Sequence, residues 1–340
     1  MFSKELRVLI ARLRSCTGLV LFTAISVFAA AAQDGLSKPN YEEREVRFNN
    51  GVIDLAGTLV MPRSSVPLPA VVVIHGSGSS DRTNPWTSAY VKALALRGIA
   101  VLHPDKRGSG KSKGDWKKAS FSDLADDTIA AVEFLRNTEG IDKARVGVAG
   151  FSQGGHIAPL AASRSSAIAF VIDVSGSVVP MFEQISDEIE MTAERAGLTA
   201  AQIGSVNEIN RKGLEYASTG KGWDEYLKLL NAAKSGDLKG HKLVEGFPSD
   251  PNDWRRDFIH AMGNFDPMPY WEKLSQPVLF VFGGKDANIR VTKSVRLIET
   301  VLDRAKTNYI LMVFKNNGHG IYREDLADFM ARWISDKGAA

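Results

Sequence analysis

Cysteine is almost absent from this sequence. The only one among the 340 residues is Cys16, which lies in the N-terminal segment. The rest of the chain therefore has no disulfide, no thiol nucleophile and no cysteine-based metal site. A domain of about 300 residues can be stable through its apolar core alone, so the lack of disulfides does not exclude an oxidising compartment.

The sequence also lacks an apolar run long enough to cross a membrane as a helix. The run at 18–28 falls short of the roughly 20 residues that such a helix needs. It follows a basic start and precedes four alanines at 29–32. This pattern is typical of a secretory signal peptide, so we expect cleavage near Ala32, a secreted or periplasmic protein and no stable membrane insertion afterwards. A retained N-terminal anchor is the alternative.

Beyond the N-terminal segment, the sequence also lacks an excess of positive or negative charge. The formal net charge is +3, but residues 1–32 carry four basic residues and one acid, which accounts for all of it. The remaining chain is close to neutral, so no basic surface for nucleic acid is expected. Apolar residues make up 44% and charged residues 24%, as is usual for a globular protein.

Strand and helix patterns alternate along most of the chain. Residues 43–48 and 52–61 predict a hairpin that turns at Gly51, and the unbroken apolar run at 69–74 predicts a strand buried on both faces. The alternation predicts an α/β fold, a mostly parallel sheet with helices on both faces. Further strands are expected at 99–103, 145–149, 168–174, 277–282 and 308–314, and helices at 84–97, 121–137, from 152 to about 163, 292–302 and 322–335.

Residues 179–276 interrupt this alternation. They contain helical patterns and no convincing strand, and the segment is too long for a simple connection between strands. We predict a helical cap, mildly acidic with 16 acidic and 11 basic residues, inserted between the core segments 41–178 and 277–340. Most of its aromatic residues should form the core of the cap itself, while one or two should line a substrate pocket.

A candidate nucleophile lies in the sequence Gly150-Phe151-Ser152-Gln153-Gly154. The motif follows an apolar strand pattern and precedes a helical one, which is where a sharp turn presents a serine at the edge of a sheet. The helix that follows offers free backbone N–H groups to a negative charge. Ser152 is therefore the predicted nucleophile.

A serine nucleophile needs a general base and an acid that orients it. Of the six histidines, only His319 lies in a glycine-flanked loop after the last predicted strand; the others are His75, His103, His156, His241 and His260. Asp286 follows the strand at 277–282, again at the carboxyl edge of the sheet. The order Ser152, Asp286, His319 along the chain is the order that an α/β-hydrolase requires.

Negative charge on the substrate oxygen needs hydrogen-bond donors. The backbone N–H of Gln153 is one candidate, and the N–H of Ser77 in the glycine-rich loop after the strand at 69–74 is the other. A phosphate-binding role for this loop is disfavoured, because no Gly-Lys-Ser/Thr follows it. The chemistry requires no metal and no organic cofactor.

Several motifs together resemble the α/β-hydrolase superfamily, most of all its serine aminopeptidase-like and dienelactone hydrolase-like branches. The resemblance covers roughly 43–335. By it, Ser152, Asp286 and His319 correspond to a catalytic triad, with Ser77 and Gln153 as oxyanion donors, and the loop 105–112 helps to shape the site. The motifs are His75-Gly76-Ser77-Gly78, the loop from Asp105 to Ser112, Gly150 to Gly154, Gly283-Gly284-Lys285-Asp286 and Gly318-His319-Gly320.

These observations predict a serine hydrolase that cleaves a carboxylic ester through an acyl-enzyme. A peptidase that acts on short peptides with the same triad is the second hypothesis. Acidic residues of the cap, such as Glu183, Asp187 or Glu190, could then bind a substrate amine. A non-catalytic binding protein on the same fold is a third, but it should lack a triad residue. The expected partner is a small-molecule ester or short peptide, and the sequence leaves the oligomeric state open.

Overall fold

The computed structural model describes residues 6–9 and 40–337. Within these residues, one sheet has the strand order β1-β9-β8-β7-β6-β4-β5-β3-β2. The strands are β1 (Leu6–Leu9), β2 (Tyr41–Asn50), β3 (Ile53–Pro62), β4 (Leu68–Ile74), β5 (Ala100–Pro104), β6 (Ile141–Phe151), β7 (Val171–Val174), β8 (Val278–Gly283) and β9 (Tyr309–Phe314).

The centre of the sheet is parallel and its margins are antiparallel. The six strands β5, β4, β6, β7, β8 and β9 lie side by side in this spatial order, and each neighbouring pair is parallel. At one margin, β2 and β3 form an antiparallel hairpin that pairs antiparallel with β5. Every residue of β4 and of β8 is buried, as an unbroken apolar run predicts for a strand covered on both faces. The predicted α/β-hydrolase fold class is thus confirmed. Strand β6 begins at Ile141, four residues before the expected start, and its first residue pairs with Leu68.

The other margin of the sheet was not expected from the sequence. Strand β1 pairs antiparallel with β9, from Leu6 opposite Phe314 to Leu9 opposite Leu311. Because β9 would otherwise present unpaired N–H and C=O groups, a short apolar segment can add there. The sequence assigned residues 1–32 to a signal peptide, but 10–39, including the expected cleavage point, lie outside the described residues. Among the described helices, none is both long and apolar enough to span a membrane.

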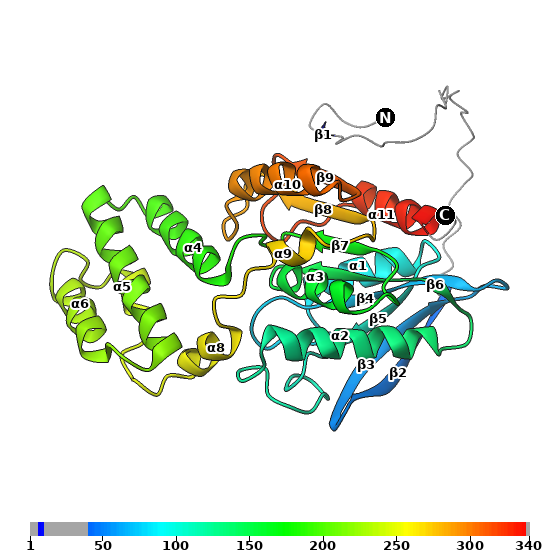
Figure 1. Cartoon of the computed structure of the whole chain (residues 1–340), viewed down its shortest axis with the longest axis horizontal. Coiled ribbons are helices and arrows are strands. Elements are labelled where there is room, and N and C mark those ends of the chain that lie inside the picture. Colours follow the sequence, from blue (N-terminus) through cyan, green and yellow to red (C-terminus); the bar gives the residue numbers. More distant parts are fainter. Residues whose placement is uncertain (1–5, 10–39, 338–340) are drawn as a thin grey trace, which may run out of the picture.

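Helices cover both faces of the sheet (Figure 1). Apolar residues of α1 (Pro85–Ala95) and α11 (Glu324–Lys337) pack on one face. Those of α2 (Phe121–Arg136), α3 (Gly154–Arg164) and α10 (Val291–Ala305) pack on the other. The N-cap of α2 is Ser120, one residue before the expected start of this helix. Ser120 Oγ accepts the Asp123 N–H at 3.1 Å while the Asp123 carboxylate accepts the Ser120 N–H, so both free N–H groups are satisfied.

The segment between β7 and β8 forms a separate group of helices beside the core (Figure 1). Buried residues such as Ile209, Tyr226 and Leu230 give it a small apolar core of its own. Trp271 instead packs on Phe280 of the sheet, with ring centroids 4.8 Å apart. The helices are α4 (Met181–Arg195), α5 (Ala200–Thr219), α6 (Trp223–Ser235), α7 (Lys242–Glu245), α8 (Trp254–Met262) and α9 (Met268–Trp271).

Candidate active site

Ser152 occupies a sharp turn between β6 and α3. Its φ of 54° is in the left-handed region, which is costly for a residue with a side chain. Its backbone N–H donates to Val174 O at 3.0 Å, which holds the turn against β7. The strained turn places the serine hydroxyl at the carboxyl edge of the parallel strands.

The two glycines of the serine motif are required by close contacts. A Cβ on Gly150 would lie 2.4 Å from Gly154 O, and a Cβ on Gly154 would lie 2.6 Å from Ile74 O. Both distances are shorter than any tolerable contact with a backbone oxygen. The motif therefore owes its glycines to the packing of this turn against its own helix and against β4.

The structure brings Ser152, His319 and Asp286 into one chain of hydrogen bonds. His319 Nε2 lies 3.0 Å from Ser152 Oγ, and His319 Nδ1 lies 2.9 Å from Asp286 Oδ2. The side chain of Asp286 is wholly buried, while that of His319 is 20% exposed. Asp286 Oδ1 also accepts the N–H groups of Asn288 and Ile289, at 2.8 and 2.9 Å. The carboxylate is therefore fixed before it meets the imidazole.

The loop that carries His319 is held by residues that the sequence analysis did not single out. Ser175 Oγ donates to His319 O at 2.8 Å, and both Trp86 Nε1 and Tyr90 Oη donate to Ile321 O at 2.8 Å. The ring of Trp86 also lies 5.5 Å from that of His319. These contacts join positions up to 235 residues apart in the chain, so no local pattern could have indicated them.

Two histidines next to the site have structural partners. His75 Nε2 bonds to Pro104 O at 2.7 Å and its Nδ1 to Ser80 Oγ at 3.0 Å, so it braces the loop after β4. His103 Nε2 bonds to Thr87 Oγ1 at 2.9 Å. Burial lowers the pKa of His75 to about 4 and that of His103 to about 3. Both are therefore neutral near pH 7.

In the part of the chain that the structure describes, none of the other three histidines forms a hydrogen bond with Ser152 Oγ. His156 is buried in α3, stacks on Phe121 and bonds to Val179 O at 3.2 Å, and burial lowers its pKa to about 4. His241 accepts the N–H of Leu243 at the start of α7, and His260 is exposed on α8. His319 is thus the histidine that the fold brings to the serine.

The two expected oxyanion donors lie close to the nucleophile. Gly76, directly before Ser77, is so near that a Cβ on it would lie 3.2 Å from Ser152 Cβ. Gln153 follows the nucleophile at the start of α3. In the described residues, neither the Ser77 N–H nor the Gln153 N–H donates to another backbone carbonyl. Both donors are thus available to a substrate oxygen.

The loop 105–112 is built around the carboxylate of Asp105. Asp105 Oδ2 accepts from Arg82 Nη2 at 2.7 Å and from the Lys111 N–H at 2.8 Å. A Cβ on Gly110 would lie 2.5 Å from this carboxylate, which explains the glycine. Arg107 turns away and pairs with Asp127 at 2.6 Å. The loop supports the oxyanion region and offers no further nucleophile.

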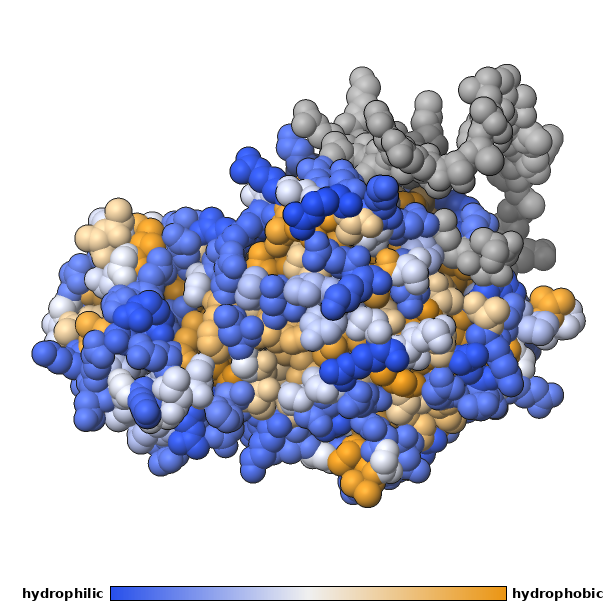
Figure 2. Space-filling view, in the orientation of Figure 1, coloured by the Kyte–Doolittle hydropathy of each residue, from blue (hydrophilic) through white to orange (hydrophobic). Residues whose placement is uncertain are grey.

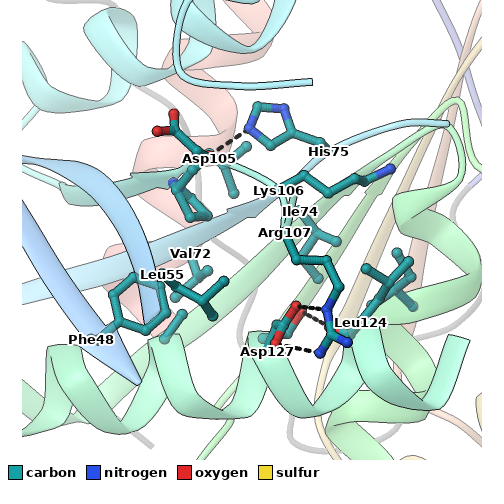
Figure 3. A pocket seen from close by; sticks show the side chains of 15 residues that line it. Phe48, Leu55, Val72, Ile74, His75, Asp105, Lys106, Arg107, Leu124 and Asp127 are labelled. Atoms are coloured by element: carbon teal, nitrogen blue, oxygen red, sulfur yellow. Dashed lines mark hydrogen bonds and ion pairs between the residues drawn. The ribbon is translucent and has the colours of Figure 1, made fainter. Parts of the chain in front are cut away.

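A cavity of about 500 Å³ lies in the cap and reaches Ser77. Its walls include the apolar side chains of Ile185, Leu214 and Phe258. Apolar residues also gather between the cap and the core on the face drawn in Figure 2. By contrast, the space in Figure 3, between the sheet and α2, measures only about 40 Å³. The cap cavity therefore offers a space large enough for a small ligand beside Ser77, one of the two expected oxyanion donors.

Among the acids of α4, Glu188 lines the cavity, and the acids named from the sequence do not; Asp250 and Asp253 line it from the other end of the cap. Glu183 and Asp187 bind Lys293 of α10 at 2.6 and 2.8 Å, and Glu190 binds Arg290. These acids fasten the cap to the core, so they are not available to a substrate amine. Glu188 accepts only a weak hydrogen bond from Gln184, at 3.3 Å, and burial raises its pKa.

The fold, the turned serine and the Ser–His–Asp hydrogen bonds together define the class: this chain belongs to the α/β-hydrolase superfamily of serine hydrolases. More narrowly, the family model described as X-Pro dipeptidyl-peptidase (S15 family) matches residues 50–320, and the chain belongs to that family. The superfamily predicted from the motifs is confirmed.

Individual relatives are distant. The chain is 24% identical over 291 residues to esterase EstD of Thermotoga maritima, which covers 84% of this chain but only 61% of EstD. Among solved structures, Est1E of Butyrivibrio proteoclasticus with bound ferulic acid matches 87% of this chain and all of that one, with a TM-score of 0.56 and 19% identity. The acylaminoacyl peptidase of Pyrococcus horikoshii matches 87% of this chain and 42% of its own, with a TM-score of 0.53 and 17% identity. At these identities the two structures show the shared fold alone.

Proposed function

We propose that this protein is a serine hydrolase that cleaves carboxylic esters of small or medium apolar acyl groups. The observation that carries the proposal is the chain of hydrogen bonds from Ser152 through His319 to Asp286, next to the cap cavity. The esterase relative EstD and the fold shared with Est1E support an ester substrate.

The reaction proceeds through an acyl-enzyme. His319 Nε2 accepts the proton of Ser152 Oγ as the oxygen attacks the ester carbonyl, and Asp286 stabilises the resulting imidazolium. The N–H groups of Ser77 and Gln153 donate to the oxyanion. His319 returns the proton to the departing alcohol, and then activates a water molecule that releases the acid and frees Ser152.

The apolar walls of the cap cavity support an apolar acyl group. Side chains such as Ile185, Leu214 and Phe258 gain contacts and lose water when an acyl chain enters. At about 500 Å³, the cavity has the volume of a site for a small ligand. A compact ester therefore fits this space better than an extended polypeptide does.

Replacing Ser152 with Ala tests the nucleophile. Hydrolysis of p-nitrophenyl butyrate should fall about 10⁵-fold, and a fluorophosphonate probe should no longer label the protein. The matched control is Ser163→Ala, because Ser163 lies in the same helix region but bonds only to Leu160 O. Near-normal turnover by Ser152→Ala would contradict the proposal.

Cleavage of short peptides is the second candidate, and Glu188 is the observation that favours it. A carboxylate with one weak partner in an apolar cavity could bind a substrate ammonium, which would offset the cost of its burial. If so, aminoacyl anilides should be cleaved faster than the matching anilides without the amine, and Glu188→Gln should abolish the difference. A preference for uncharged esters in both proteins would rule this candidate out.

We further propose that the enzyme acts outside the cytoplasm, on the basis of the basic and apolar pattern in residues 1–32. N-terminal sequencing of the protein from a secreting host should find a start near residue 33. A mature chain that retains residues 1–32 would contradict cleavage.

A further inference from the structure

One buried lysine has no role in the reaction described so far. Lys106 directly follows Asp105 after β5, and it is only 8% exposed. Figure 3 shows that its side chain extends away from Arg107, which turns instead toward Asp127. Two neighbouring cations in the chain thus point in different directions, one to an acid and the other toward the loop after β4.

The ammonium of Lys106 contacts three oxygens around the expected oxyanion hole. Its Nζ donates to Gly76 O at close range, to Gly78 O at 3.2 Å and to Gln153 Oε1 at 3.0 Å. The two carbonyls flank Ser77, and Gln153 is the residue of the other expected donor. A single group therefore connects both sides of the hole.

The contact with Gly76 O acts on the Ser77 N–H through the peptide bond. The C=O of Gly76 and the N–H of Ser77 belong to one planar trans unit, in which the two groups point in opposite directions. Fixing the carbonyl therefore fixes the direction of the N–H. A cation bonded to the carbonyl also polarises the unit and makes its N–H a stronger donor.

The charge of Lys106 is not neutralised by an acid. In the described ranges, no carboxylate forms an ion pair with it, and Asp105 binds Arg82 instead. Burial lowers the pKa of Lys106 to about 7, so the ammonium and the neutral amine are both present near pH 7. A negative charge that forms nearby favours the ammonium. Such a charge arises on the substrate oxygen only during the reaction.

We propose that Lys106 is a positioning residue of the oxyanion hole, which orients and polarises the Gly76–Ser77 peptide toward the developing negative charge. This inference rests on the proposed function of Ser152. Because the effect is specific to the transition state, loss of the ammonium should lower kcat and leave KM nearly unchanged.

The test compares Lys106→Met with Lys111→Met on a p-nitrophenyl ester. Lys111 lies on the same loop but is exposed and pairs with Glu45, so its variant should keep wild-type kinetics. Lys106→Met should lower kcat by about 10- to 100-fold, with KM within about twofold, since removing a direct oxyanion donor costs about 10²–10³-fold. A trifluoromethyl ketone, which Ser152 converts to a tetrahedral hemiketal, should bind more weakly by the same factor as kcat.

A second variant covers the case in which Lys106→Met does not fold. Gln153→Glu is almost isosteric and places a carboxylate on Nζ while the lysine stays in place. It should also lower kcat and weaken ketone binding, because the ammonium is then neutralised. Wild-type kcat in both variants, or equal losses in kcat and in substrate affinity, would overturn the assignment. Ser152→Ala is measured in the same assay. If it is inactive while the Lys106 and Gln153 variants behave as the wild type, only the role of Lys106 is rejected, and the proposed nucleophile is retained.

Discussion

The core and the cap are built on different principles. In the core, Ser152, Asp286 and His319 lie just beyond the ends of parallel strands, so backbone pairing sets their positions. In the cap, helices with a small apolar core surround a cavity, and side chains set its shape. Reaction rate and substrate selectivity should therefore be separable by mutation. Changes at strand ends should alter the chemical step, while changes in the cap should alter which ester reacts.

The two regions are also joined by few charged contacts. Arg290 binds Glu190 and Glu194 of α4 at 2.9 and 3.2 Å, and Lys293 binds Glu183 and Asp187. Such partly exposed pairs each contribute little to stability, about 1 kcal/mol or less. Apolar contacts join the two regions as well, because Met181, Met262 and Trp271 of the cap pack in the main hydrophobic cluster of the core.

After loss of the nucleophile itself, the largest effect is expected from Asp286→Asn in the core. The new amide would keep its oxygen on the N–H groups of Asn288 and Ile289 and turn its NH₂ toward His319 Nδ1. Nδ1 would then have to accept, so Nε2 would carry the proton and could not take one from Ser152. We expect kcat to fall about 10⁴-fold.

The control for this variant is Asp328→Asn, since Asp328 is an exposed partner of Arg97 on α11. Ester hydrolysis by the control should match the wild type, and thermal unfolding should be similar in all three proteins. Equal kcat for Asp286→Asn and the wild type would show that Asp286 does not hold the His319 tautomer.

The second largest effect is expected on the stability of the core at low pH, because some of its histidines are buried in the neutral form. His156 has a folded pKa of about 4 because of burial, below its ordinary 6.5. Between these values the unfolded chain binds a proton that the folded chain does not, so stability falls as pH drops from about 6.5 to 4. The free energy of unfolding falls by about 3 kcal/mol because of this residue. His75, whose pKa is also lowered to about 4, causes a similar decrease.

Urea unfolding at pH 7 and pH 4.5 measures this loss. In His156→Gln the amide can still donate to Val179 O but cannot become protonated, so the pH dependence should be weaker than in the wild type. His260→Gln, on the cap surface, should leave it unchanged. The same slope in His156→Gln as in the wild type would remove His156 from the explanation.

The smallest effect is expected in the cap. Ile185→Phe should fill part of the cavity and lower kcat/KM for an octanoate ester about tenfold, while an acetate ester reacts nearly as before. Leu96→Phe, at a site on the core that is 61% exposed, is the control. An equal loss for both esters in Ile185→Phe would contradict the division between core chemistry and cap selectivity.

Local patterns predicted most of the core, for physical reasons. Apolar runs such as 69–74 indicate buried strands directly, and the chain order of Ser152, Asp286 and His319 follows from where parallel strands end. The structure places these three side chains in contact, and their catalytic roles stay predictions until the variants are measured.

What could not be predicted depends on distant contacts. The partner of β9 is a short strand about 300 residues away, and the support of His319 by Ser175 and Trp86 joins its loop to the loop after β7 and to helix α1. The packing of α4 against α10 decides which acids of α4 bind α10 and which one lines the cavity. Such pairings leave no periodic trace in the sequence.

Gly283 shows how a residue without chemistry can be indispensable. Even a single methyl group there would lie 2.3 Å from Gly318 O and would push apart the two loops that carry Asp286 and His319. In a screen of random variants for lost activity, Gly283→Ala should appear among the inactive clones although every reacting group is still encoded. Replacing one hydrogen atom of Gly283 with a methyl group should therefore abolish activity as surely as replacing the Ser152 nucleophile.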